Sequence, residues 1–226
     1  MAEKALKKNK AHVVYKNAAG KRVPGVTTIC GIMDKPALVS WANRMGLEGI
    51  DTRSYVDSLA GAGTLAHYLV ECDFRNVDPD PDVLREYAPA DMDRAENSLL
   101  SYYEWRKVHV VTPIANEIQL VSEKLQVGGT CDIYAEVDTT KTLIDIKTCK
   151  ALYGTTDEKW TQVAGYYLIM EENGYHVDEV YILRIGRDES EGFEYVPIPD
   201  LSLHIKRFKT CRELYDINSQ LRRVKV

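Results

Sequence analysis

Hydrophobic and polar positions follow two different periods along the chain, and each period predicts one kind of element. Helical spacing of apolar residues predicts helices at 36–48, 64–75, 92–109, 158–173 and 200–222. An alternation of period two predicts strands at 116–121, 124–127, 130–137, 142–147, 177–186 and 193–198. Near the start, 11–16 and 21–29 are expected to form a hairpin around the turn at 17–20.

The order of these elements predicts an α/β fold class, with a central mixed β-sheet flanked by helices and an N-terminal helical region. We expect Gly61 and Gly63 to precede the helix at 64–75, and the Asp- and Pro-rich stretch 77–91 to be a loop or a short helical piece. No linker or repeat divides the 226 residues. We therefore expect a single domain over 1–226, mainly helical over 1–110 and built around the sheet over 111–226.

Composition narrows the class of protein. With 45% hydrophobic and 28% charged residues, the chain is not collagen-like, coiled-coil or wholly disordered. No apolar run approaches the roughly 20 residues of a membrane span, and the opening MAEKALKKNK lacks the apolar core of a signal peptide, so an intracellular, cytoplasmic protein without a membrane partner is expected. The five cysteines are widely spaced, which excludes a disulfide framework and a zinc ribbon.

Charge is distributed unevenly although the net charge is only -5. Residues 1–22 and the C-terminal tail are basic, whereas 71–96 is acidic. Each basic residue taken alone is expected to be a solvated surface position. Taken together, two basic ends on an acidic chain are a weak indication of a polyanionic partner.

The stretch 128–147, with its Gly128-Gly129 turn, carries the candidate chemistry. Its two strands flank a turn at 138–141, so Asp132 is expected to lie nearly opposite Asp145. Asp145 and Lys147 share one face of their strand because side chains alternate. Two buried carboxylates at one place are unfavourable unless a cation compensates them, and a hard divalent metal ion would do so.

A lone DxK triplet is usually a surface ion pair, so the surrounding residues decide whether it is interpreted as part of a catalytic site. Gly63 to His67 is expected to open a helix and present His67 one turn in. Glu117 is expected to begin the strand that precedes the glycine turn. Gln162 and Tyr166 are four apart, on one face of a predicted helix.

The order GTxxH, E, GGTxD, DxK and QxxxY over 63–166 resembles the RecB-type branch of the PD-(D/E)xK nuclease superfamily. It is most similar to the phage-type exonucleases of that branch, which are also similar to the mitochondrial genome maintenance exonuclease. The upstream stretch VPGVTTICGIMDKPALVSWANRMGLEGI resembles the N-terminal block of these phage enzymes. The resemblance implies a restriction-endonuclease-like core and hydrolysis of DNA from free ends.

The resemblance also implies roles for residues. The metal ligands would be Asp132, Asp145, the carbonyl oxygen of Ile146, and His67. Lys147 would position or activate the attacking water and stabilise charge on the phosphate. The other implied catalytic or DNA-contacting positions are Glu117, with Glu123 as a weaker competitor, and Gln162 and Tyr166, which would contact the DNA backbone or orient the lysine.

The implied cofactor is Mg²⁺ or Mn²⁺, with the histidine favouring Mn²⁺. Some relatives hold an iron–sulfur cluster with clustered C-terminal cysteines, and since only Cys211 lies near the end here, no cluster is expected. The implied partners are single- or double-stranded DNA with free ends and a phage single-strand annealing or single-strand-binding protein. The setting would be phage recombination, replication or repair in a bacterial host.

Other interpretations remain open. A catalytically silent DNA-binding or recombination accessory protein could share the fold, although retention of Asp132, Asp145 and Lys147 weighs against it. A restriction-type endonuclease could share the core, although His67 and QxxxY favour the exonuclease branch. A zinc peptidase using His67 and Glu71 is disfavoured because HExxH is absent. Trp41 is expected to stack on single-stranded DNA if 36–48 arches over the site.

Overall fold

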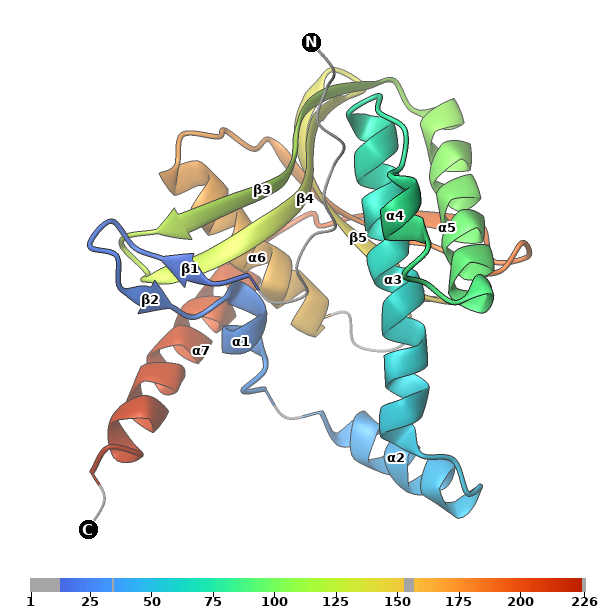
Figure 1. The fold of residues 1–226 in the computed structure, drawn as a ribbon. Helices are drawn as coiled ribbons and strands as arrows, with labels where there is room; N and C mark the ends of the chain where they lie inside the picture. The colour runs from blue at the N-terminus through green and yellow to red at the C-terminus, as the bar shows by residue number, and fades with distance from the viewer. Residues whose placement is uncertain (1–12, 34, 153–156, 225–226) are drawn as a thin grey trace.

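A mixed five-stranded sheet forms the centre of the molecule (Figure 1). The computed structural model describes residues 13–33, 35–152 and 157–224. The strands lie in the order β3-β4-β5-β6-β7. Only β5 and β6 are parallel; the other neighbouring pairs are antiparallel. The bounds are Val111–Ser122 (β3), Val127–Val137 (β4), Thr140–Thr148 (β5), Glu179–Ile185 (β6) and Phe193–Pro197 (β7).

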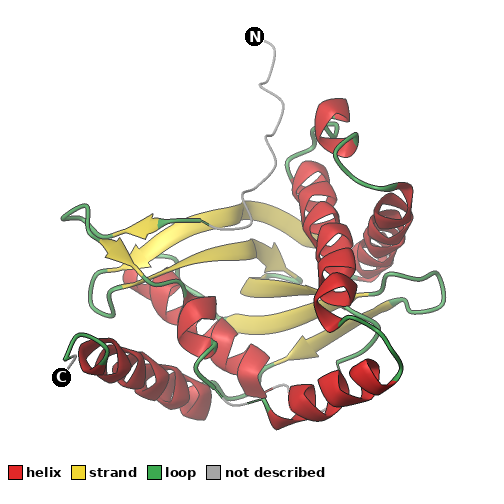
Figure 2. Cartoon of the chain, turned by 60° about the horizontal axis from the view of Figure 1, so that its bottom comes forward, coloured by secondary structure: helices red, strands yellow, loops and turns green. Residues whose placement is uncertain are grey.

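Helices cover both faces of the sheet (Figures 1 and 2). On one face α6 (Asp157–Glu172) packs on β3 and β4 and carries α1 (Val26–Cys30) and α7 (Ser202–Leu221). On the other, α3 (Thr52–Phe74) and α5 (Pro89–Val108) pack together and against the strands, with α4 (Pro81–Leu84) between them in sequence. The N-terminal hairpin consists of β1 (Tyr15–Lys16) and β2 (Arg22–Val23), and α2 (Pro36–Leu47) adjoins α3.

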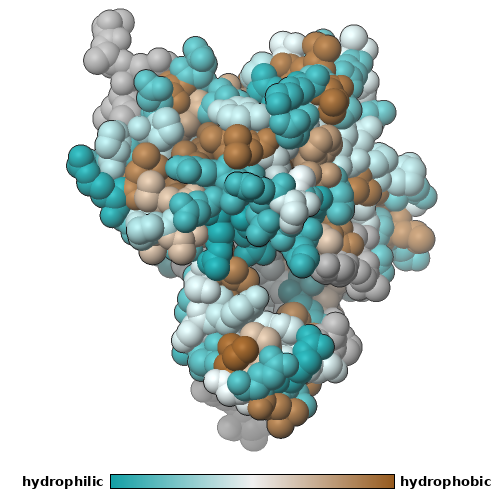
Figure 3. Space-filling model, turned by 90° about the vertical axis from the view of Figure 1, so that its right-hand side faces the viewer, coloured by the Kyte–Doolittle hydropathy of each residue, from teal (hydrophilic) through white to brown (hydrophobic). Residues whose placement is uncertain are grey.

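Each face of the sheet has its own core. Ile169 and Phe208 are fully buried between β4, α6 and α7. Tyr102 and Trp105 of α5 are fully buried against the opposite face. The outer side of the α4 and α5 region is largely hydrophilic with separate hydrophobic areas (Figure 3), as expected for helices that bury one stripe.

The predicted fold class is confirmed: a mixed sheet flanked by helices, preceded by a mainly helical N-terminal region. The helices predicted at 36–48, 92–109, 158–173 and 200–222 are present within a few residues, and α4 supplies the short helical piece within 77–91. No helix in the described parts of the chain has both the length and the apolarity needed to cross a membrane.

The prediction for 64–75 was wrong in its start, because α3 begins at Thr52. Asp51 caps the helix by accepting a 2.7 Å hydrogen bond from the Ser54 backbone N–H. Gly61 and Gly63 therefore lie inside α3. At Gly63 a Cβ atom would come within 2.9 Å of Thr148 Oγ1, so the glycine serves the close approach of α3 to β5.

Several predicted strand boundaries were also wrong. The segment 21–29 contains only the short β2 before α1. Residues 116–121 belong to the longer β3, and the turn between β3 and β4 occupies most of 124–127 and includes Gln126 at φ +51°. Gly128 and Gly129 lie within β4, and the β4–β5 turn is limited to Asp138 and Thr139.

The basic N-terminal segment is largely outside the described residues, which exclude 1–12, and so is the first part of the strand predicted at 11–16. Lys225 of the basic tail is outside them as well.

Candidate active site

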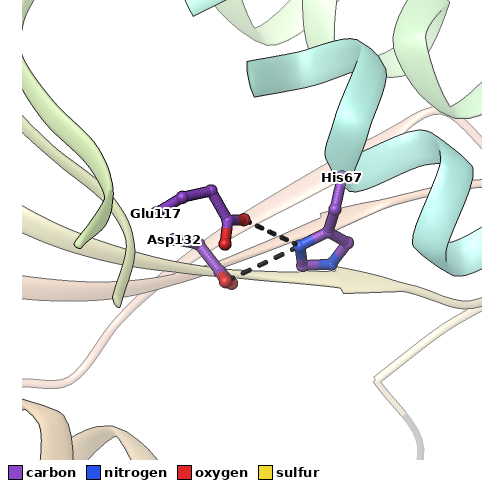
Figure 4. A group of neighbouring side chains, drawn as sticks. All are labelled: His67, Glu117 and Asp132. Carbon is purple, nitrogen blue, oxygen red and sulfur yellow. Dashed lines mark ion pairs between the residues drawn. The ribbon is translucent and has the colours of Figure 1, made fainter. Parts of the chain in front are cut away.

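Three side chains from three elements converge on one point: His67 from α3, Glu117 from β3 and Asp132 from β4 (Figure 4). His67 Nδ1 lies 3.6 Å from Asp132 Oδ1 and 3.9 Å from Glu117 Oε1. One ligand atom from each residue lies within 4.8 Å of the others. A nitrogen and two carboxylate oxygens at this spacing are a donor set that could hold a divalent cation.

His67 reaches this point from well inside α3, not from its first turn as predicted. The close approach of Gly63 to Thr148 brings this part of the helix next to the end of β5. His67 is one helical turn beyond Gly63, so its side chain points toward the sheet. The imidazole remains 29% exposed, which leaves it accessible to a ligand.

Glu117 lies in the middle of β3 and has a positive φ of +49°. This left-handed conformation costs a non-glycine residue about 1–3 kcal/mol. The register pairs Asn116 with Ile133 and Ile118 with Cys131, which puts Glu117 opposite Asp132. Arg75, just after α3, donates from Nε to Asn116 Oδ1 at 2.9 Å and pairs with Glu71 at 2.8 Å. The contacts of Arg75 fix Asn116, the residue immediately before the strained Glu117.

Asp132 and Asp145 lie across from each other as the sequence predicted, because Ile133 pairs with Ile144. Asp132 Oδ2 accepts a 2.7 Å hydrogen bond from the Ile146 backbone N–H, while Oδ1 faces His67. Asp145 is only 4% exposed and instead meets Lys147, with 2.6 Å between Oδ2 and Nζ. Of the four predicted ligands, the structure therefore places His67 and Asp132 in one cluster with Glu117, with Asp145 and Ile146 adjoining.

Lys147 begins a chain of polar contacts toward α6. Its ammonium donates to Gln162 Oε1 at 3.4 Å, and Gln162 Nε2 donates to Tyr166 Oη at 2.8 Å. Gly129 makes room for the tyrosine, because a Cβ there would lie 2.8 Å from Tyr166 Cδ1. The QxxxY pair predicted from the sequence thus contacts the lysine of the DxK triplet.

The charges in the cluster shift one another's pKa values. Burial alone would lower the pKa of His67, but the Asp132 and Glu117 carboxylates raise it to about 10. Burial would raise the pKa of Asp132, but His67 and Lys147 lower it. Burial and the neighbouring Asp132 raise the pKa of Glu117. Without a cation, the cluster therefore favours an imidazolium between carboxyl groups.

The Asp145–Lys147 pair is governed by burial and mutual attraction. Burial raises the pKa of Asp145, and Asp132 adds to this effect, while Lys147 opposes it. Burial would lower the pKa of Lys147, but Asp145 and Asp132 raise it, so the ammonium stays charged at neutral pH. Burial holds the pKa of Tyr166 well above its usual value, so the phenol stays neutral.

Two cavities meet at the cluster. The first, of about 500 Å³, is called here the hairpin cavity and extends toward Tyr15, Thr28 and Gln119. The second, of about 350 Å³, is called here the lysine cavity and contains Asp145, Ile146, Lys147, Lys159 and Gln162. Both are lined by His67, Asp132, Thr148 and Tyr166. Every predicted site residue except Trp41 and the weaker candidate Glu123 lines one of the two cavities.

Trp41 lines neither cavity. It lies on α2 and contacts Tyr55 near the start of α3, with ring centroids 6.1 Å apart. Glu123, the weaker competitor of Glu117, lies in the β3–β4 turn and accepts a 2.7 Å hydrogen bond from the Ala18 N–H.

Sequence reasoning missed several residues of the site. Tyr15 packs so closely on Gly128 that a Cβ there would lie 2.1 Å from Tyr15 Cγ, and its hydroxyl is 2.8 Å from Thr130 Oγ1. The sequence predicts a turn at Gly128 and Gly129, whereas both lie within β4 and leave room for the rings of Tyr15 and Tyr166. Arg75 and Lys159 carry no motif, and only the fold brings them to the site.

Comparison with known proteins gives little further information. No family model and no curated protein matches the chain. A crystal structure of a candidate exonuclease from Eubacterium rectale is 12% identical, with a TM-score of 0.49 over 68% of this chain and 64% of the other. The structure of SSO0001 is 13% identical, with a TM-score of 0.30 over 59% and 64%. The chain thus spans less than two thirds of the length of either neighbour.

Proposed function

We propose that this chain is a metal-dependent deoxyribonuclease of the RecB-type PD-(D/E)xK branch, an exonuclease acting from free DNA ends. The observation that carries the proposal is that a donor set for a cation and a buried carboxylate–lysine pair lie side by side where two cavities meet. His67, Glu117 and Asp132 form a donor set for a cation, and the buried Asp145–Lys147 pair lies beside it. Nuclease chemistry uses both a cation site and a nearby positive charge.

The charge arrangement supports phosphodiester hydrolysis. A bound Mg²⁺ or Mn²⁺ would supply counter-charge to the phosphate and lower the pKa of the attacking water. Carboxylate ligands suit both ions, and the imidazole nitrogen favours Mn²⁺ somewhat more. Burial, with the neighbouring Asp132 carboxylate, raises the pKa of Glu117, and a cation bound between the two carboxyl groups would relieve their repulsion.

The residues of the chain have distinct roles in this proposal. His67, Glu117 and Asp132 hold the cation, with Asp145 and the Ile146 carbonyl as adjoining oxygen donors. Lys147, held by Asp145 and Gln162, places its ammonium where charge develops on the phosphate.

The proposal includes further roles for residues of α6 and α2. Gln162 and Tyr166 orient Lys147 or contact the DNA backbone, and the hydrogen bonds from Lys147 to Gln162 and from Gln162 to Tyr166 support the first of these roles. Trp41 stacks on a single strand outside the cavities.

The biological setting is part of the same proposal. The substrate would be single- or double-stranded DNA in phage recombination, replication or repair, within the cytoplasm of a bacterial host. A phage single-strand annealing or single-strand-binding protein would be the partner. These finer points rest on the resemblance of the motifs between Gly63 and Tyr166.

End-labelled linear DNA and covalently closed circles test the proposal together. The protein is incubated with both, in Mg²⁺, Mn²⁺ or EDTA, beside an Asp145→Asn variant and an Asp93→Asn control on the exposed side of α5. We expect metal-dependent loss of linear DNA only, abolished in Asp145→Asn and retained in Asp93→Asn. Cut circles would indicate an endonuclease, and DNA binding without cleavage under any metal would indicate a silent accessory protein.

A further inference from the structure

The hairpin cavity differs chemically from the lysine cavity that adjoins it. Within the described parts of the chain, no lysine or arginine lines it. Its walls offer hydroxyl, amide and aromatic groups instead: Tyr15, Thr27, Thr28, Tyr68, Gln119 and Thr130. Besides tyrosine, the titratable side chains that line it among residues 13–33, 35–152 and 157–224 are those of the cation cluster, His67, Glu117 and Asp132. Such a lining suits an uncharged polar ligand with a ring.

The cavity is firmly built on one side and open to ligands on the other. The Tyr15 hydroxyl is 2.8 Å from Thr130 Oγ1, and Gly128 lets the ring pack against β4. Thr27, Thr28 and Gln119 are exposed at its edge, and their side chains make no hydrogen bond to another described residue. These three side chains are free to bind polar atoms of a ligand.

The volume fits one small molecule. About 500 Å³ lies within the roughly 300–1,000 Å³ typical of small-ligand sites. The lysine cavity, by contrast, carries the ammonium groups of Lys147 and Lys159 and is suited to phosphates. The two cavities share the residues around His67 and Asp132, so a chain that crosses from one to the other passes the cation cluster.

We propose that the hairpin cavity binds the nucleoside, sugar and base, at the end of a DNA strand. The scissile phosphate then lies at the cation cluster, and the following backbone phosphates lie along Lys147 and Lys159. This inference rests on the proposed nuclease function and specifies how a free end is recognised. A further phosphate on the terminal nucleoside would lie beyond the cation cluster, among hydroxyl and amide groups, where no lysine or arginine of the described residues lines the cavity, so hydroxyl ends are the preferred substrates.

Direct binding tests the cavity without hydrolysis. Saturation-transfer NMR with 2′-deoxyadenosine is performed on wild type, on Gln119→Trp, which fills the edge of the cavity, and on Thr112→Trp, a matched exposed position of β3 that lines neither cavity. We expect a signal in wild type and Thr112→Trp and its loss in Gln119→Trp. Equal signals in all three, or none in wild type, would overturn the proposal.

Substrate ends provide the second test. Oligonucleotides with a hydroxyl or a phosphate at the attacked end are compared in kcat/KM, and we expect about a tenfold preference for the hydroxyl, reduced in Gln119→Trp. Faster cleavage of phosphorylated ends would contradict the cavity's assignment while leaving the nuclease function standing. Nucleoside binding without any DNA cleavage would do the reverse: it would support the cavity and contradict the nuclease.

Discussion

The ammonium of Lys147 lies 2.6 Å from Asp145 Oδ2, on a strand where the two side chains share one face. Gln162 holds the same ammonium from α6 at 3.4 Å. A lysine with two such partners is fixed in position even though it is 22% exposed. Fixed charge stabilises a transition state better than mobile charge, because little reorganisation is needed during the reaction.

Replacing this ammonium should remove catalysis. Lys147→Met keeps the apolar stem and should lower single-turnover hydrolysis at saturating metal by about 10²–10³-fold. Circular dichroism should show a folded protein. Lys141→Met, on the exposed start of the same strand, is the control and should retain full activity. Full activity in Lys147→Met would remove the lysine from the chemistry.

Asp132 should act chiefly through metal affinity. Asp132→Asn keeps the size of the side chain but removes the charge that faces His67 at 3.6 Å. We expect at least about a tenfold weaker affinity for Mn²⁺ by calorimetry, with partial recovery of hydrolysis in excess Mn²⁺. An unchanged affinity for Mn²⁺ would exclude Asp132 from the ligand set.

Arg75 should matter although it lies outside both cavities. Its hydrogen bond to Asn116 at 2.9 Å fixes the chain beside the strained Glu117. Arg75→Ala should weaken Mn²⁺ binding about tenfold, as loss of a supporting contact does, and Arg75→Lys should recover little because it cannot form the same fork. Arg85→Ala serves as the control, because Arg85 is exposed and its ion pair among the described residues is with Asp82 in its own turn. Equal Mn²⁺ affinity in the two alanine variants would refute this role.

Metal binding should depend on pH through His67. Its pKa is about 10 in the metal-free protein against an ordinary 6.5, so a bound cation must displace a proton throughout that interval. The affinity for Mn²⁺ should therefore rise with pH by up to about tenfold per unit. In His67→Asn the part of this rise in Mn²⁺ affinity with pH that comes from the histidine should disappear. An equal dependence of Mn²⁺ affinity on pH in wild type and His67→Asn would contradict the role of His67 as a metal ligand.

The raised pKa of His67 should make the metal-free protein less stable as the pH rises, whereas Mn²⁺ binding becomes stronger as the pH rises. Because the pKa of His67 is higher in the folded chain, its contribution is complete below pH 6.5 and is lost as the pH rises through about 10. The thermal unfolding temperature of the metal-free wild type should fall as the pH rises through about 10, and that of His67→Asn should lack this decrease. A bound cation should replace the lost stabilisation, since it binds the folded state.

Trp41 is predicted to contribute to binding of single-stranded DNA from α2. Trp41→Ala should weaken oligonucleotide affinity by about 1–3 kcal/mol, the range for one stacked base. Leu38→Ala, at an exposed position of the same helix, is the control. Fluorescence anisotropy measures both, and an unchanged affinity in Trp41→Ala would exclude stacking.

Local patterns predicted much of the fold because they report local physics. The alternation over 130–147 placed Asp132 opposite Asp145, and the structure has this register. Helical spacing likewise predicted that Gln162 and Tyr166 share a face. Both relationships depend on neighbouring residues or on one tight turn, which a sequence specifies directly.

Long-range contacts could not be predicted in the same way. The sequence predicts that Gly61 and Gly63 precede a helix and that Gly128 and Gly129 form a turn, although the first two lie within α3 and the others within β4. Their small size serves partners such as Thr148 and Tyr15, which are far away in sequence. The strained backbone of Glu117 depends in the same way on the fold around it. Tertiary packing decided these positions, and local propensity did not.

The most direct test of the account measures metal binding and DNA hydrolysis on the same samples. Mn²⁺ is titrated by electron paramagnetic resonance into wild type and into the double variant His67→Asn, Asp132→Asn, and each sample is assayed on end-labelled linear DNA. We expect the double variant to lose bound Mn²⁺ and hydrolysis together. Hydrolysis by wild type in EDTA, or undiminished hydrolysis by the double variant, would contradict it.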